Sequence, residues 1–152
     1  MEGTREPRQK GFTLIELMVV LVIIGIASAV VGLNIHPDPM QSLRKDAQRL
    51  AQLLQIAQTE AQADGRPISW SADTQGYRFS RRADDGQRDQ FSADSQLRPR
   101  AWQTTAMQVR IEPKQRLLLT AEWVSEPLQI LLSDGQHSIS VQRSANGRVS
   151  VQ

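Results

Sequence analysis

The stretch Lys10-Gly11-Phe12-Thr13-Leu14-Ile15-Glu16, followed by an apolar run from Leu17 to Ile35, decides how this chain is built. The 24 residues from Phe12 to Ile35 contain one charged side chain. As an α-helix they would extend for about 36 Å, because each residue adds about 1.5 Å. The hydrocarbon core of a bilayer is about 30 Å thick. The sequence therefore predicts a membrane-spanning helix over residues 12–35.

Glu16 is an unexpected residue in such a helix. A carboxylate costs roughly 2.5 to 3.5 kcal/mol at the bilayer centre, so a simple anchor would avoid it. Small residues recur at spacings of three and four in the same segment, at Gly25, Ser28, Ala29 and Gly32. This spacing places them on one stripe, where another helix can approach closely. We expect Glu16 and this stripe to serve helix assembly.

A cleaved secretory signal peptide is an alternative for the same segment. The basic start, the apolar middle and Ala27-Ser28-Ala29 satisfy the usual cleavage rule and would release a protein that begins at Val30. The acidic side chain of Glu16 and the apolar residues that continue to Ile35 argue against it.

The distribution of basic residues favours one orientation in the membrane. Arg5, Arg8 and Lys10 precede the apolar run, whereas residues 36–43 contain no Lys or Arg. Because basic flanks stay in the cytoplasm, we expect the short leader there and the rest of the chain on the other side.

The whole chain is long enough for one small domain beyond the anchor. It has 152 residues, a formal net charge of +2 and no cysteine. Such a charge is not typical of a basic nucleic-acid-binding domain, and without cysteine there are neither disulfides nor thiolate metal sites.

An amphipathic helical segment is predicted over residues 36–64, with a kink or short break at its start, His36-Pro37-Asp38-Pro39, where both prolines remove a backbone donor. Asp38 is a suitable N-cap, Pro39 a suitable first residue and Gln41 a capping-box partner, while Asp64-Gly65 is a suitable end. The helix has an apolar stripe made of Leu43, Ala47, Leu50, Leu54, Ala57 and Ala61. We therefore expect an amphipathic helix that covers a sheet.

Beyond Gly65 the hydrophobic period changes from helical to two. Ile68 and Trp70 alternate with polar residues, and a turn at 73–76 leads to Tyr77 and Phe79. Similar runs follow at 107–111, 117–123, 128–132, 139–141 and 149–151, with turns at 133–136 and at Asn146-Gly147. About seven short strands are thus predicted in a β-rich head over residues 65–152.

The segment from Ser80 to Arg100 has no such pattern. A calcium site is one interpretation, with Asp84, Asp85, Asp89 and Asp94 as ligands, although no calcium-loop spacing supports it. Binding of nucleic acid by arginines, chiefly Arg81 and Arg82, is another. A solvated, mobile loop at about 80–100 is favoured over both, because the acids and the arginines can pair with one another.

The chain contains no recognisable catalytic pattern. His36 and His137 lie far apart, and neither a G-x-S-x-G turn nor a glycine-rich phosphate loop is present. We expect no enzyme, no cofactor and no metal. A pocket lined by Trp70 and Trp123 would favour a membrane-tethered enzyme or carrier instead.

Residues 10–16 resemble the class III signal of type IV pilins and type II secretion pseudopilins. The head is similar to the H-type minor pseudopilins, the GspH/FimT group, at Ile68-Ser69-Trp70, Gly76-Tyr77-Arg78-Phe79 and the segments 132–135 and 146–149. The terminal cysteine pair of many pilus subunits is absent, as is a convincing calcium loop of the major pseudopilin. Both differences favour a minor pseudopilin.

This resemblance implies an α+β protein whose long N-terminal helix, with a transmembrane part and an amphipathic part, packs on a small antiparallel sheet or β-sandwich. It also implies that prepilin peptidase removes residues 1–11 by cutting between Gly11 and Phe12, and that Phe12 is N-methylated. Glu16 would face the new terminus of a neighbouring subunit, and helices would bundle through Gly25, Ala29 and Gly32.

The same resemblance implies a place in the bacterial inner membrane, with the head in the periplasm. The partners would be other minor and major pseudopilins, prepilin peptidase, membrane lipid and secreted substrate. The protein would join the tip complex of a pseudopilus that pushes folded exoproteins outward. The alternative is a type IV pilus minor pilin that primes a pilus or takes up DNA through Arg81 and Arg82.

Overall fold

A computed structural model describes residues 13–32, 38–122 and 126–152, with the side-chain surroundings of 29–32 left undescribed. The chain divides into two compact units, residues 1–37 and residues 38–152. In the first unit the described structure is the helix α1, Leu14–Gly32. None of the helices in the described ranges combines the length and the hydropathy needed to cross a membrane. The predicted span over 12–35 extends at both ends into residues outside these ranges.

The second unit begins with α2, Pro39–Asp64, close to the predicted helix. The Asp38 carboxylate accepts a hydrogen bond of 3.0 Å from the Met40 amide, so it caps the first turn without help from Gln41. Gly65 ends the helix in the left-handed conformation, with φ of 67°. All six residues of the predicted apolar stripe are buried, which confirms the predicted core-facing side. Two polar residues that the stripe did not include, Asp46 and Gln58, are also buried.

Two antiparallel sheets make up the rest of the head. The first has the order β3-β2-β1-β6, with β4 paired to β2. The second has the order β5-β7-β8-β9. The first sheet comprises β1 Ile68–Ala72, β2 Gly76–Arg82, β3 Arg88–Asp89, β4 Arg100–Ala101 and β6 Leu117–Leu119. The second comprises β5 Gln108–Glu112, β7 Leu128–Ser133, β8 Ser138–Arg143 and β9 Val149–Val151.

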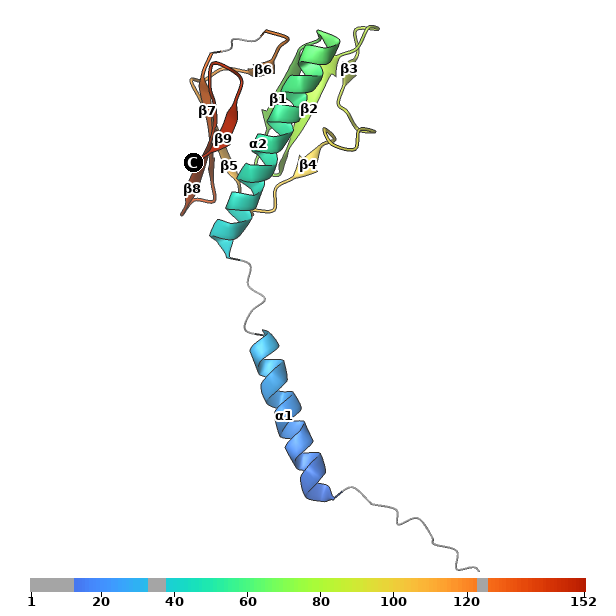
Figure 1. Ribbon diagram of the computed structural model, residues 1–152, viewed down its shortest axis with the longest axis vertical. Helices are drawn as coiled ribbons and strands as arrows, with labels where there is room; N and C mark the ends of the chain where they lie inside the picture. Colours follow the sequence, from blue (N-terminus) through green and yellow to red (C-terminus); the bar gives the residue numbers. More distant parts are fainter. Residues whose placement is uncertain (1–12, 33–37, 123–125) are drawn as a thin grey trace, which may run out of the picture. The chain divides into compact units, whose positions relative to one another are not determined.

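The core of the head lies between α2 and the inner faces of the two sheets (Figure 1). In the first sheet Trp70 pairs with Phe79, and both side chains are buried. In the second, Ile130 pairs with Val141, and both are again buried. In these two strand pairs the alternating patterns therefore marked the inward residues correctly. The predicted α+β architecture, with a helix on antiparallel sheets, is confirmed.

The segment 80–100 has more structure than its sequence pattern indicated. β2 continues to Arg82, and the short strands β3 and β4 both pair with it. Phe91 and Leu97 are buried in the core. A Cβ at Gly76 would overlap the backbone carbonyl oxygen of Arg100, so β4 approaches β2 closely only because residue 76 is glycine. The prediction of about seven strands missed β3 and β4.

Candidate functional site: the exposed helix and the charged end of the head

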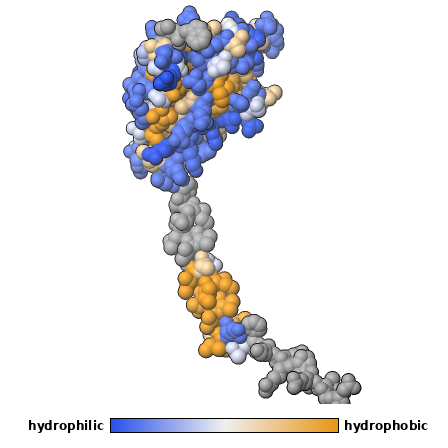
Figure 2. Space-filling model, viewed as in Figure 1, coloured by the Kyte–Doolittle hydropathy of each residue, from blue (hydrophilic) through white to orange (hydrophobic). Residues whose placement is uncertain are grey.

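The described surface of α1 is almost wholly apolar. Its large apolar side chains from Leu14 to Ile26 are between 44% and 79% exposed, and they form the continuous hydrophobic surface of this helix in Figure 2. The head covers its own apolar residues far better, since its only exposed large ones among the described residues are Ile56, at 37%, and Leu118, at 46%. An apolar surface of this extent marks a site of contact with membrane or protein.

Glu16 lies in the first turn of α1 and is exposed. The turn is closed by the Thr13 carbonyl oxygen, which accepts hydrogen bonds from the amides of Glu16 at 3.0 Å and Leu17 at 3.3 Å. A carboxylate at this end of a helix is stabilised by the partial positive charge of the free amides. The helix therefore tolerates the charge locally, and the carboxylate remains available to a partner.

The small residues of α1 lie on the side opposite Glu16. Each helical residue turns by about 100°, so Gly25 is rotated by about 180° from Glu16, and Ala29 and Gly32 follow within about 40° of Gly25. Apart from the neighbouring residues and the backbone of the helix itself, no described heavy atom lies within 4 Å of a Cβ placed on Gly25. Ala29 and Gly32 belong to the helical backbone, but their surroundings are outside the described part. Gly11 and Phe12, the predicted processing residues, also lie outside it.

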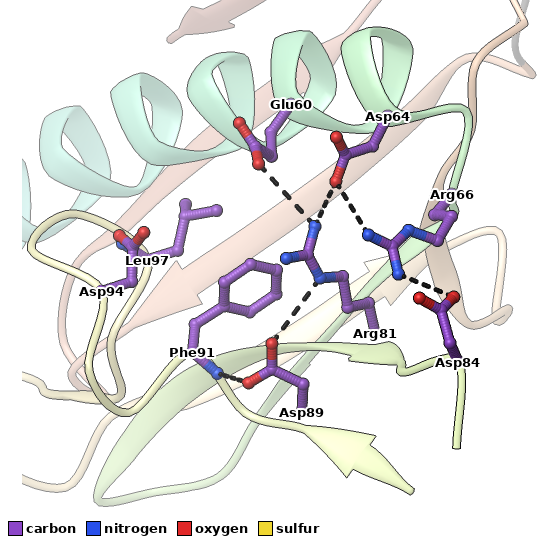
Figure 3. A network of polar contacts seen from close by, with 9 residues as sticks. All are labelled: Glu60, Asp64, Arg66, Arg81, Asp84, Asp89, Phe91, Asp94 and Leu97. Carbon is purple, nitrogen blue, oxygen red and sulfur yellow. Dashed lines mark hydrogen bonds and ion pairs between the residues drawn. The ribbon is translucent and has the colours of Figure 1, made fainter. Parts of the chain in front are cut away.

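In the head, Arg81 stands at the centre of a charged cluster (Figure 3). Its guanidinium lies 2.5 Å from an oxygen of Asp64, 3.7 Å from Glu60 and 3.6 Å from Asp89. Its Cζ is 4.9 Å from the ring centre of Phe91, a cation–π arrangement. The Arg81 side chain is only 19% exposed. It thus joins β2 to the last turn of α2 and to the segment after β3.

The other side chains of this cluster are also engaged. Arg66 binds Asp64 at 3.5 Å and Asp84 at 3.1 Å. Asp89 accepts a hydrogen bond from the Phe91 amide, and Asp94 accepts two from the amides of Gln96 and Leu97. These two backbone bonds hold the pKa of Asp94 below its ordinary value of 3.8.

Several of the carboxylates considered as calcium ligands therefore already form ion pairs or backbone hydrogen bonds, among them those of Asp84, Asp89 and Asp94. Asp84 and Asp89 pair with arginines, as the alternative interpretation of the sequence expected. In the described ranges no three His, Asp or Glu side chains gather closely enough to hold a metal ion.

The arginines predicted to contact nucleic acid differ in their surroundings. Arg81 faces three carboxylates, which compete with any phosphate for its guanidinium. Arg82 is exposed and points to the other side of the sheet, because neighbouring residues of a strand alternate. The geometry thus disfavours their acting as a pair.

A buried carboxylate that the sequence analysis missed joins α2 to the loop after β4. Asp46 is 2% exposed and accepts hydrogen bonds from the amides of Gln103, at 3.0 and 3.1 Å, and Thr104, at 2.9 Å. Its position provided a signal, since it lies three residues after Leu43 and four before Leu50, on the apolar side of the helix.

Trp70 does line a hollow, of about 330 Å³, together with Val109, Arg110, Ile111 and Lys114. Its indole is 4% exposed and packs on Tyr77, with ring centres 6.4 Å apart. Trp70 is thus mainly a core residue. Trp123, the other residue considered for a pocket with Trp70, lies outside the described residues.

An apolar N-terminal helix with an acid in its first turn, followed by a helix on a β-rich head, defines the pilin-like class of proteins. Two solved structures share the fold of nearly three quarters of this chain. One is the minor pseudopilin EpsH from the type 2 secretion system of Vibrio cholerae, with a TM-score of 0.59 and 17% identity over 73% of this chain and 96% of that one. The other is the type IV minor pilin FimU of Pseudomonas aeruginosa, with a TM-score of 0.54 and 19% identity over 72% and 87%.

Sequence comparison is more specific. The family described as type II transport protein GspH matches residues 46–148, and the prokaryotic N-terminal methylation motif matches residues 7–32. The chain belongs to the GspH family of type II transport proteins. It is also 34% identical over 80 residues to the type II secretion system protein H of Aeromonas hydrophila; the aligned part is 52% of this chain and 44% of that relative.

Proposed function

We propose that this protein is a minor pseudopilin that works in the tip complex of a type II secretion pseudopilus. It is a structural subunit, and its chemistry is assembly with other pseudopilins. The observation that carries the proposal is the exposed apolar helix α1 with Glu16 in its first turn, joined in one chain to a GspH-type head. The tip complex would prime a pseudopilus that pushes folded exoproteins across the outer membrane.

We propose that the leader, residues 1–11, is removed by prepilin peptidase between Gly11 and Phe12 and that Phe12 is then methylated. The match of residues 7–32 to the N-terminal methylation motif supports this. The mature chain would hold residues 12–35 in the inner membrane as a single span, surrounded by lipid, with residues 36–152 in the periplasm. There the head would meet other pseudopilins and the secreted substrate.

Within the assembly, Glu16 would pair with the positively charged N-terminus of a neighbouring subunit. Opposite charges attract strongly where the dielectric is low, so this pair can offset the cost of burying the carboxylate. The opposite side of α1, with Gly25, Ala29 and Gly32, would allow close packing of a second helix.

Substitution of Glu16 tests this role. We expect Glu16→Val to leave membrane insertion intact or improved, because it removes the one charge from the apolar segment. Incorporation into the pseudopilus should be lost. Membrane fractionation and co-purification of the assembled pseudopilus measure the two effects separately.

Two further variants serve as controls in that experiment. Glu16→Asp keeps the charge and should retain part of the incorporation. Gly11→Ala should keep residues 1–11, which mass spectrometry detects as an untrimmed chain, whereas Glu16→Val should be trimmed normally. Normal incorporation of a trimmed Glu16→Val protein would contradict the pairing role.

A further inference from the structure

A hollow of about 660 Å³ lies on the outer face of the first sheet, away from α2. Its floor is made by Ser69 and Ser80, which are directly paired across β1 and β2 and whose hydroxyl oxygens lie 2.9 Å apart. Leu118 pairs with Ser69 on the other side. We call this hollow the arginine groove, because its remaining wall includes Arg66, Arg81, Arg82, Arg88 and Arg116.

The lining of the arginine groove contains no carboxylate. The charges of Arg66 and Arg81 are balanced by ion pairs with the acids of the cluster in Figure 3. Arg82, Arg88 and Arg116 are exposed, and no ion pair joins them to any carboxylate of the described residues. The groove therefore presents three uncompensated positive charges around a small polar floor.

Two of these positive charges belong to residues that face each other on neighbouring strands. Arg82 and Arg88 are directly paired across β2 and β3. Like charges in this position destabilise a strand pair, whereas the adjacent pair, Arg81 with Asp89, joins opposite charges. The arrangement of Arg82 and Arg88 thus disfavours the hairpin but suits an anionic ligand that binds both guanidinium groups at once.

The apolar part of the groove identifies the kind of ligand. Leu118 is 46% exposed, and Pro67 also lines the groove. Proteins that bind single-stranded nucleic acid stack bases on exposed aromatic rings. In the described part of the head, the aromatic side chains are all at least 92% buried, namely those of Trp70, Tyr77, Phe79, Phe91 and Trp102. None of them is exposed for such stacking, which favours a peptide over a nucleic acid as the ligand.

We propose that the arginine groove binds an acidic segment of another protein of the assembly, with carboxylates on Arg82, Arg88 and Arg116 and an apolar side chain on Leu118. The identity of that partner as an assembly component rests on the proposed function. The binding chemistry does not, since it depends only on the groove. A clustered positive charge in a hollow attracts such a segment more strongly than the same charges spread over the surface.

Binding of a fluorescent oligoglutamate peptide to the full chain in non-ionic detergent tests the proposal. Fluorescence anisotropy at low ionic strength should show saturable binding that weakens as salt is added. Replacing Arg82, Arg88 and Arg116 together by Ala should raise the dissociation constant about tenfold or more, because three charge contacts are lost. Leu118→Ser should have no such effect on this purely acidic peptide but should weaken a peptide that alternates Glu with Leu.

The matched control replaces Arg98, Arg110 and Arg148 by Ala, three exposed arginines outside the groove, with the same change of net charge. This control should change the dissociation constant less than about twofold. Equal losses in the two triple variants, or no binding by the unchanged protein, would overturn the proposal. Tighter binding of an oligothymidine probe through the same three arginines would also overturn it, in favour of a nucleic-acid ligand. None of these results depends on pseudopilus formation, which the Glu16 variants test separately.

Discussion

At the residue scale, Arg81 is the side chain that ties the segment 83–99 to the head. It is held by carboxylates of α2 and of β3 and lies over Phe91, a buried residue in an unusual conformation with φ of 53°. A left-handed backbone is disfavoured for a bulky residue and persists only where its surroundings fix it. The contact between Arg81 and Phe91 is one such restraint.

We expect Arg81→Met to lower the free energy of unfolding of the head by about 1–2 kcal/mol, because three acids lose their common partner in a mostly enclosed position. Urea unfolding followed by tryptophan fluorescence measures this change. Limited proteolysis should also cut the segment 83–99 faster.

Arg78→Met is the matched control for that variant. Among the residues that the structure describes, Arg78 forms an ion pair with Asp73 alone, at 3.3 Å, and its side chain is 48% exposed. Its loss should therefore change the free energy of unfolding by less than about 0.5 kcal/mol. Equal effects of the two substitutions would mean that the cluster contributes no more than a surface ion pair.

The two clusters of polar contacts show what a sequence can and cannot indicate for single residues. Asp46 carried a signal in its helical position, since a polar residue on an apolar stripe must find partners. For Arg81 the sequence indicated only that arginines and acids of its segment can pair. It did not indicate the partners Glu60 and Asp64, because these come from a helix whose packing is set by the core. The prediction of Arg81 as a nucleic-acid contact followed from residue type alone.

At the element scale, prediction succeeded where local chemistry and periodicity agree. The helix α2 has an Asp-Pro start, a Gly end and a regular stripe, so its limits were predictable. The hairpins β1–β2, β7–β8 and β8–β9 have alternating residues and clear turns. β3 and β4 have two residues each, too few for a period, and they exist because β2 offers them an edge.

The β7–β8 turn has a measurable pH signature. The Asp134 carboxylate accepts hydrogen bonds from the amides of His137, at 2.6 Å, and Gln136, at 2.8 Å, and lies 3.1 Å from the His137 ring. These contacts, the His137 amide first, lower the pKa of Asp134 from 3.8 to about 2. Between these two values the unfolded chain takes up a proton that the folded chain does not.

We therefore expect this turn to stabilise the head fully above about pH 4 and progressively less as the pH falls toward 2. Asp134→Asn should flatten the pH dependence of the free energy of unfolding in this window, measured by urea titrations at successive pH values. His137→Ala keeps both backbone bonds and should retain most of the slope. An unchanged slope in Asp134→Asn would contradict the assignment.

At the scale of the whole molecule, the two units differ in whether their apolar residues are exposed to solvent. The buried apolar residues of the described chain begin at Leu43 and all lie in the head. The described apolar residues of α1 are exposed. The sequence predicted this division, but it left open a single sheet or a sandwich, because the order of strands depends on contacts between residues far apart in the chain.

We expect a chain that begins at Asp38 to fold, with a free energy of unfolding within about 0.5 kcal/mol of the full chain in detergent, since it retains every buried apolar residue of the core. Calorimetry or urea unfolding measures this difference. A chain that begins at Leu50 lacks Leu43, Asp46 and Ala47 and should not fold cooperatively. A large loss of stability on removing residues 1–37 alone would show that the head depends on them.

The arrangement of α1, with a carboxylate on one side and small residues on the other, limits the kinds of oligomer that the protein can form. One neighbouring helix cannot contact both sides of α1 at once, because the two sides point about 180° apart. If both sides bind neighbouring subunits, as proposed above, each protomer makes two different contacts, and a dimer leaves one of them unused. Repeated head-to-tail addition would use both contacts, and it gives a ring when the rotation closes and an open helical fibre with a fixed polarity when it does not.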